Sequence, residues 1–159
     1  MDYQKITTKD ILILGNKVNM CFLTNGEKTG KLARAFMPRL KEISNRVGTD
    51  SFSIQNYENF DIKTMTAKTL FEKWIGVEVS DFNSVPENME SLVISGGNFL
   101  VFRFQGSVAD FIKFWQQLHT EWLPNSSYQL DNRPHFEKLP AGYNPMRDDN
   151  QEEIWIPIK

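Results

Sequence analysis

The sequence predicts an α+β fold in which two ββαββ units form one antiparallel sheet with two helices on one face. Two observations lead to this prediction. The two halves of the chain align at a constant offset, and each half shows the same succession of strand and helix periodicities. The 159 residues suffice for one domain with a core. We therefore expect a single domain over residues 1–159, with pseudo-repeats at about 10–80 and 90–159 and a central ligand cleft between the helices.

The repeat emerges when the sequence is shifted by 79 positions, which places Asn19 on Asn98. Three pairs of segments then align without a gap: 19–23 with 98–102, 57–58 with 136–137, and 74–79 with 153–158. Chance readily produces one such match, whereas three at a single offset indicate an internal duplication.

Residues 10–24 and 90–105 are each predicted to form two strands joined by a turn. In the second copy, the apolar runs Leu92-Val93-Ile94 and 99–104 flank Ser95-Gly96-Gly97-Asn98. Two glycines in the turn supply the positive φ angles that tight hairpins need.

One helix follows the strands in each half. In the second half, apolar residues recur at three- and four-residue steps over 108–122, Ser107 is the expected N-cap with Asp110 three residues on, and Pro124 is the expected stop. In the first half a matching stripe runs over 32–47. Gly48 is its expected stop, and two strands are then predicted to close each half, at about 51–58 and 72–80 and at 134–139 and 152–159.

Composition excludes several classes of function. The net charge of −2 and the pI near 5.7 provide no basic surface for nucleic acid. The single cysteine, Cys21, cannot form an intramolecular disulfide and fits a reducing cytoplasm. No apolar stretch approaches the roughly 18 residues that a membrane span needs. We expect a cytoplasmic protein that binds neither nucleic acid nor membrane and carries no metal or other cofactor.

Four short motifs resemble the GyrI-like, AraC-type effector-binding domains. They are Gly76-Val77-Glu78-Val79, Trp122-Leu123-Pro124, Phe136-Glu137 and Glu153-Ile154-Trp155-Ile156-Pro157-Ile158. The resemblance covers about residues 10–159 and implies the duplicated fold predicted above.

The resemblance also implies a function. Relatives include ligand-sensing domains of multidrug-responsive transcription regulators, gyrase inhibitors, stand-alone drug-binding modules from integron cassettes, and some hydrolases. Because about ten residues precede the first predicted strand, we expect no attached helix-turn-helix and no direct DNA binding. The expected activity is stand-alone binding of a small cationic, lipophilic molecule.

The resemblance implies that Glu153 supplies the acidic group at the bottom of the cleft and that Glu137 is a second acid. Strand alternation places Trp155 on the same face as Glu153, and the repeat alignment adds Trp74 from the other half. A carboxylate flanked by indole rings suits a desolvated cation. The alternative is that Glu153 is a solvated residue on an edge strand.

Four further aromatic residues are candidates for ligand contact. The 79-residue offset pairs Trp115 with Phe36 on the helices and Tyr57 with Phe136 on the strands. Each could belong to the ordinary core, to the cleft wall, or to both. Tyr143, in the long loop before the last strand, is a surface tyrosine or a residue that closes over the cleft.

Two other functions remain open. A hydrolase would use Glu153 or Glu137 as base and a tyrosine as acid, and a protein-interaction module would bind a protein partner instead. The histidines, His119 and His135, are interpreted as surface or capping residues. The sequence has no nucleophile–histidine pattern, phosphate loop or metal-ligand spacing, so we expect a binding protein and not an enzyme.

Overall fold

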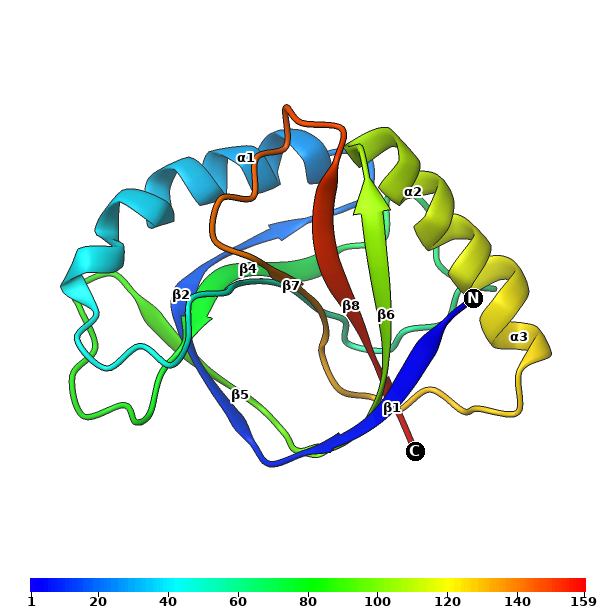
Figure 1. Ribbon diagram of the computed structural model, residues 1–159, viewed down its shortest axis with the longest axis horizontal. Helices are drawn as coiled ribbons and strands as arrows, with labels where there is room; N and C mark the ends of the chain where they lie inside the picture. The colour runs from blue at the N-terminus through cyan, green and yellow to red at the C-terminus, as the bar shows by residue number, and fades with distance from the viewer.

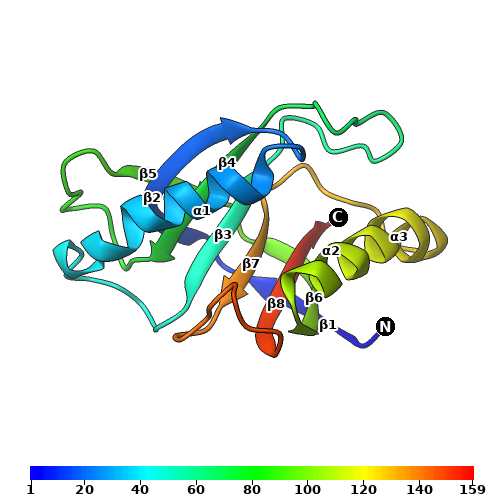
Figure 2. The same cartoon turned by 90° about the horizontal axis from the view of Figure 1, so that it is seen from above.

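The computed structural model describes residues 1–159 as one eight-stranded antiparallel sheet with two long helices on one of its faces (Figures 1 and 2). This confirms the predicted fold class. The strands are β1 (Tyr3–Thr8), β2 (Ile11–Met20), β3 (Ser51–Asn56), β4 (Phe71–Glu78), β5 (Glu90–Ile94), β6 (Gly97–Gly106), β7 (His135–Leu139) and β8 (Asn150–Ile158). The helices are α1 (Asn25–Phe36), extended by the 3-10 turn η1 (Met37–Glu42), and α2 (Val108–Gln117), extended by the π-helical turn η2 (Leu118–Trp122) and α3 (Leu123–Asn125).

The strand order is β1-β6-β8-β7-β3-β4-β2-β5. It reads the same from both ends when β1 is matched with β5, β2 with β6, β3 with β7, and β4 with β8. Two paired ββαββ units would produce this order, and the duplication itself stays a prediction. The central pair is β3 and β7, with Ser53 opposite Glu137.

The predicted hairpins are wrong. Residues 10–24 contain the single strand β2, and the strand before it, β1, was not predicted. The apolar runs on either side of Gly96 do form β5 and β6, but β5 pairs with β2 while β6 pairs with β1 and β8. The reason is that the turn directs its two strands to opposite ends of the sheet. The Gly96 N–H donates to the Asp10 carboxylate (2.7 Å), so the β1–β2 and β5–β6 corners meet and bend the sheet into a trough (Figure 1).

The helices also depart from the predicted ends. The first helical segment stops at Glu42, and Val47 instead donates its N–H to the Glu78 carbonyl beside the sheet (2.8 Å). The Ser107 N-cap is confirmed, with a reciprocal capping box to Asp110. Pro124 does not end the helix but lies in the first turn of α3, where its missing N–H is not needed.

The sheet buries apolar side chains on both faces. The helix face carries one cluster under α1 and one under α2, and the first of these contains the fully buried Phe36. The opposite face, inside the trough, carries a separate cluster of nine buried residues: Ile13, Phe52, Ile54, Trp74, Ile94, Phe99, Val101, Phe136 and Trp155. The two helix-face clusters leave a polar strip between them along the central strands.

Candidate ligand site between the two helices

Four of the residues predicted to contact the ligand lie on the face of the sheet away from the helices. Trp155, Trp74 and Phe136 belong to the trough cluster, and Glu153 points to the same side because strand residues alternate. Ile154, between Glu153 and Trp155, packs in the cluster under α2. The structure therefore does not bring these four residues into the space between the helices.

Trp74 already has a cation from its own chain. Its Nε1 donates to Glu72 (2.6 Å), and Lys17 Nζ lies 5.5 Å from its ring centroid. Lys17 also pairs with Glu72 (3.5 Å) and Glu90 (3.7 Å). The Trp74 indole, which was predicted to contact a ligand cation, thus has a lysine of this chain over its ring.

Trp155 repeats this arrangement. Its Nε1 donates to Glu153 (2.9 Å), and Lys138 Nζ lies 5.4 Å from its ring centroid and 3.7 Å from an oxygen of Asp50. The chemistry inferred from sequence, an indole beside a carboxylate with a cation over it, is present. The cation is again a lysine of this chain.

A second cluster of polar and charged residues lies on the helix face of the sheet, along the strip between α1 and α2. Figure 2 shows β3, β7 and β8 between the two helices. Lys73, Glu137 and Glu152 expose only 4%, 6% and 8% of their surface there. Gln55 Nε2 donates to Glu137 Oε2 (2.9 Å). Of these residues only Glu137 was predicted from the sequence.

Sequence reasoning missed Glu152 and Lys73, although each had a signal. Glu152 has the same strand parity as Ile154 and Ile156, which pack under α2. Lys73 lies between Phe71 and Ile75 on the face of β4 that α1 covers. A charged residue in register with buried apolar neighbours points into the interior, and this pattern could have marked both as buried, although not which face of the sheet they occupy.

The strip is desolvated and acidic on balance. Burial raises the pKa of Glu152 to about 8, with a further contribution from the charge of Glu137, and Lys73 opposes the shift. Burial also raises the pKa of Glu137 and lowers the pKa of the Lys73 ammonium, although the charges of both acids act in the opposite direction on Lys73. No ion pair shorter than 4.0 Å joins Lys73 to either carboxylate. Two acids and one ammonium therefore lie close together without direct pairing.

Aromatic side chains form one end of this strip. Trp115, on the side of α2, has its ring centroid 5.4 Å from that of Phe22, which precedes α1. Tyr57, at the end of β3, contacts Phe60 (4.8 Å), and its pKa is raised by burial and by the charge of Glu137. The structure thus brings together three of the predicted residues, Trp115, Tyr57 and Glu137.

The two histidines are buried in this aromatic cluster, so their assignment to the surface or to a helix cap is wrong. His119 stacks on Trp115, with ring centroids 4.0 Å apart, because it follows Trp115 by about one helical turn. Its Nδ1–H donates to the Trp115 carbonyl (2.8 Å), and burial lowers its pKa to about 4. Burial also lowers the pKa of His135 well below its usual value. Neither Nε2 atom has a hydrogen-bond partner.

The 79-residue offset pairs residues that the structure separates. Phe36, the last residue of α1, is fully buried against the sheet, whereas Trp115 on α2 is half-buried. Tyr57 lies on the helix face, and Phe136 lies in the trough. Tyr143 is half-buried in the β7–β8 loop, which rises between the helices in Figure 1. Burial and the charges of Glu152 and Glu137 raise its pKa to about 12.

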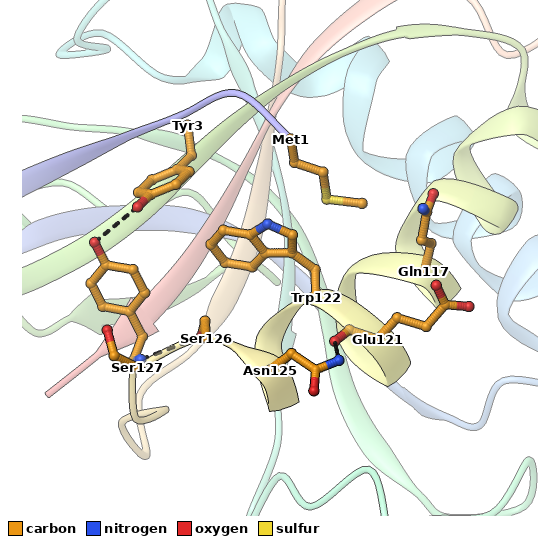
Figure 3. A pocket seen from close by; sticks show the side chains of 9 residues that line it. Met1, Tyr3, Gln117, Glu121, Trp122, Asn125, Ser126 and Ser127 are labelled. Atoms are coloured by element: carbon orange, nitrogen blue, oxygen red, sulfur yellow. Dashed lines mark hydrogen bonds between the residues drawn. The ribbon is translucent and has the colours of Figure 1, made fainter.

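The surface also has two hollows of about 560 Å³ each, of which only the second reaches a residue of this strip. The first lies between the N-terminus and the end of the second helix (Figure 3). Its rings contact one another: Tyr3 packs against Trp122 (5.1 Å), and the hydroxyls of Tyr3 and Tyr128 are 3.1 Å apart. The packing of these rings holds β1 against the end of the second helix. The second hollow lies at the ends of β6, β7 and β8 and is lined mainly by charged residues, Glu152 among them.

No group of three or more His, Cys, Asp or Glu side chains has the geometry to hold a metal ion. None of the helices is both long enough and apolar enough to cross a membrane.

The chain is thus an α+β domain with an acidic and aromatic strip between its two helices. Residues 6–158 match the Cass2 family of integron-associated effector binding proteins, and the chain belongs to this family. A comparison with curated proteins found no match. The resemblance stated from the sequence motifs is therefore confirmed at the level of the family.

Solved structures show the same fold. SAV2435 bound to tetraphenylphosphonium is 14% identical, with 100% of this chain and 94% of that chain covered and a TM-score of 0.76. An integron cassette protein of Vibrio cholerae is 14% identical, with 99% and 95% covered and a TM-score of 0.69. A hydrolase from Listeria innocua is also 14% identical, with 99% and 91% covered and a TM-score of 0.58. At these identities the likeness concerns the fold alone.

Proposed function

We propose that this protein binds a lipophilic organic cation between α1 and α2. Glu137 and Glu152 attract the charge, and Trp115 and Tyr57 contact the apolar part of the ligand. The observation that carries the proposal is the pair of buried carboxylates, which have no cation within 4.0 Å. The tetraphenylphosphonium complex of a protein with this fold supports it.

Physical chemistry favours a cation over other ligands. A buried carboxylate is unstable unless it is paired or hydrogen-bonded, and here burial already raises the pKa values of both acids. An organic cation supplies the missing charge without needing donors, and a cation over an aromatic ring contributes about 0.5–2 kcal/mol. An anion of the same shape would meet like charge in a site of low dielectric constant.

The proposal keeps Glu137, Trp115 and Tyr57 from the sequence-based set and adds Glu152. The other predicted residues serve as controls. Glu153 is the best control because it is the adjacent residue on the same strand and points to the opposite face.

The test compares tetraphenylphosphonium with tetraphenylborate, which has nearly the same shape and the opposite charge. Tryptophan fluorescence would report binding to the wild type and to Glu137→Gln, Glu152→Gln and Glu153→Gln. We expect each of the first two substitutions to weaken cation binding by about tenfold, equivalent to about 1.4 kcal/mol, and Glu153→Gln to leave it unchanged. Equal affinity for the two ions, or an equal loss with Glu153→Gln, would refute the proposal.

A hydrolase is the second candidate because one observation favours it. Tyr57 and Tyr143 both lie near Glu137, and an acid with a pKa of about 8 can exchange protons at neutral pH. We expect binding without turnover. Incubation with p-nitrophenyl acetate and other activated esters tests this. Hydrolysis above the buffer rate that Glu152→Gln abolishes would establish an enzyme instead.

A further inference from the structure

The hollow between the N-terminus and the end of the second helix is separate from the strip between α1 and α2. None of the residues that line it belongs to that strip (Figure 3). Its volume of about 560 Å³ lies within the range of pockets that hold small molecules, which is about 300–1,000 Å³. A ligand bound in this hollow would therefore be independent of the cation proposed above.

Three aromatic rings line one side of the hollow. Trp122 and Tyr128 are nearly parallel (19°) with ring centroids 6.4 Å apart, and Tyr3 meets both edge-on at 5.1 and 5.9 Å. Trp122 and Tyr128 are half-buried, and Tyr3 is 40% exposed. The two tyrosine hydroxyls are 3.1 Å apart, so one donates to the other and one O–H hydrogen is left over. The rings thus provide an aromatic surface that solvent reaches and one unused donor.

Polar side chains with unused hydrogen-bonding groups lie around these rings. Gln117 and Glu121 make no side-chain hydrogen bond or ion pair within the chain. Asn125 uses only its Nδ2, which donates to the Glu121 carbonyl (2.8 Å), so its Oδ1 is free. Figure 3 shows these three side chains around the Trp122 ring, on the side away from Tyr3. The amides donate and accept, and the carboxylate accepts.

The π-helical turn η2 keeps these polar residues on one side of the helix. Gln117, Glu121 and Asn125 follow one another at steps of four residues. A step of four exceeds an α-helical turn of 3.6 residues and falls short of the wider π turn, so the two deviations offset each other. Turns of this kind are rare and occur frequently at functional sites. The turn is thus a second feature, independent of the hollow's shape, that points to a ligand here.

We propose that this hollow binds a neutral ring with several hydroxyl groups, such as a pyranose sugar. The C–H face of the ring packs on Trp122 and Tyr3, as apolar groups pack on aromatic surfaces. Each ligand hydroxyl both donates and accepts, which matches the mixed groups of Gln117, Glu121 and Asn125. A purely apolar ligand would leave these groups without partners.

Charged ligands fit this hollow less well. Glu121 is the only charged side chain that lines it, and its carboxylate would repel an anion. The three rings contact one another, with centroids 5.1 to 6.4 Å apart, so no cation fits between them. The chemistry of the hollow therefore differs from that of the buried acids between α1 and α2.

The test titrates the protein with the methyl pyranosides of glucose, galactose, mannose and N-acetylglucosamine. Tryptophan fluorescence and saturation-transfer NMR report binding. We expect at least one of these sugars to bind with a Kd below about 10 mM. Cyclohexanol has a similar ring with a single hydroxyl and should bind at least tenfold more weakly. Binding of none of the sugars, or equal binding of cyclohexanol, would overturn the proposal.

Gln117→Ala and Gln116→Ala form a matched pair that locates the site. Gln116 is the adjacent exposed residue and does not line the hollow. We expect Gln117→Ala to weaken sugar binding at least fivefold and Gln116→Ala to change it less than twofold. Both variants should keep the melting temperature and the tetraphenylphosphonium affinity of the wild type, because both side chains are exposed and lie outside the strip. An equal loss with the two variants, or no loss with Gln117→Ala, would contradict the assignment.

Discussion

The two faces of the sheet carry the same kinds of residue and use them differently. In the trough, Trp74 and Trp155 each bond to a glutamate, and Lys17 and Lys138 lie over their rings. On the helix face, Glu137 and the aromatic cluster have no cation within ion-pairing distance. An aromatic and acidic arrangement therefore indicates a cation site, but only the neighbouring residues decide whether the cation is a lysine or a ligand.

The largest effects are expected from replacing Trp155 in the trough and Trp115 between the helices. Trp155→Ala should lower the free energy of unfolding by about 3–5 kcal/mol, because Trp155 is buried among the trough residues. Trp115→Ala should cost less stability, because Trp115 is half-buried, but should abolish detectable binding of tetraphenylphosphonium. Urea unfolding and ligand titration of both variants check this. The reverse ranking in either assay would contradict the distinction between the faces.

The pH dependence of binding sharpens the role of Glu152. Its pKa of about 8 means that the side chain is largely protonated at pH 6.5, and only its ionised form attracts a cation. Affinity for tetraphenylphosphonium, whose charge does not titrate, should rise by up to about tenfold per pH unit until the pH reaches about 8. Calorimetry in two buffers should show proton release. Glu152→Gln should flatten the profile, and an unchanged profile would exclude this role.

The raised pKa of Glu152 also predicts that the free energy of unfolding declines as the pH rises. Its pKa in the folded protein exceeds the ordinary value of 4.5, so the folded state holds more protons than the unfolded state between pH 4.5 and about 8. The free energy of unfolding without ligand should receive a contribution from Glu152 that falls as pH rises through this window. Comparing urea midpoints of the wild type and Glu152→Gln at pH 6 and 8 measures it. A smaller decline in the wild type than in the variant would count against the predicted sign.

His119 should change stability in the opposite direction and over a lower pH range. Its pKa of about 4 lies below the ordinary 6.5, so the unfolded state binds more protons in this interval and stability is lost as pH falls from 6.5 to 4. At pH 5 the loss from this group is about 2 kcal/mol. His119→Phe keeps a ring against Trp115 without titrating. It should reduce the difference between urea midpoints at pH 7 and pH 5, and an undiminished difference would exclude the role of His119.

The smallest effect is expected from replacing Lys17, the lysine that lies over Trp74 in the trough. Lys17→Met removes the contact with Trp74 and two ion pairs that lie partly in solvent. We expect a loss of about 0.5–1 kcal/mol in the free energy of unfolding and no change in ligand affinity. Urea unfolding and the phosphonium titration test both parts. A large change in ligand affinity would mean that the trough takes part in binding.

Local sequence signals predicted several elements well. The capping box at Ser107 marked the start of α2, and alternation correctly placed Glu153 and Trp155 on one face. The hairpin at Gly96 failed because local sequence favours a tight turn but does not show that its strands belong to different ends of the sheet. The buried histidine His119 was missed because its burial depends on Phe60, which lies far away in sequence.

The last strand separates what sequence determines from what only the tertiary structure decides. Because neighbouring side chains in a strand point to opposite faces, the sequence alone determines that Glu152 and Glu153 look in opposite directions. It does not determine which of them faces the helices, because both parities of this strand contain large apolar residues. The structure decides this when Ile154 and Ile156 pack under α2 and Trp155 packs in the trough. Glu152 thereby becomes the acid between the helices, because hydrophobic packing of its neighbours selects the face.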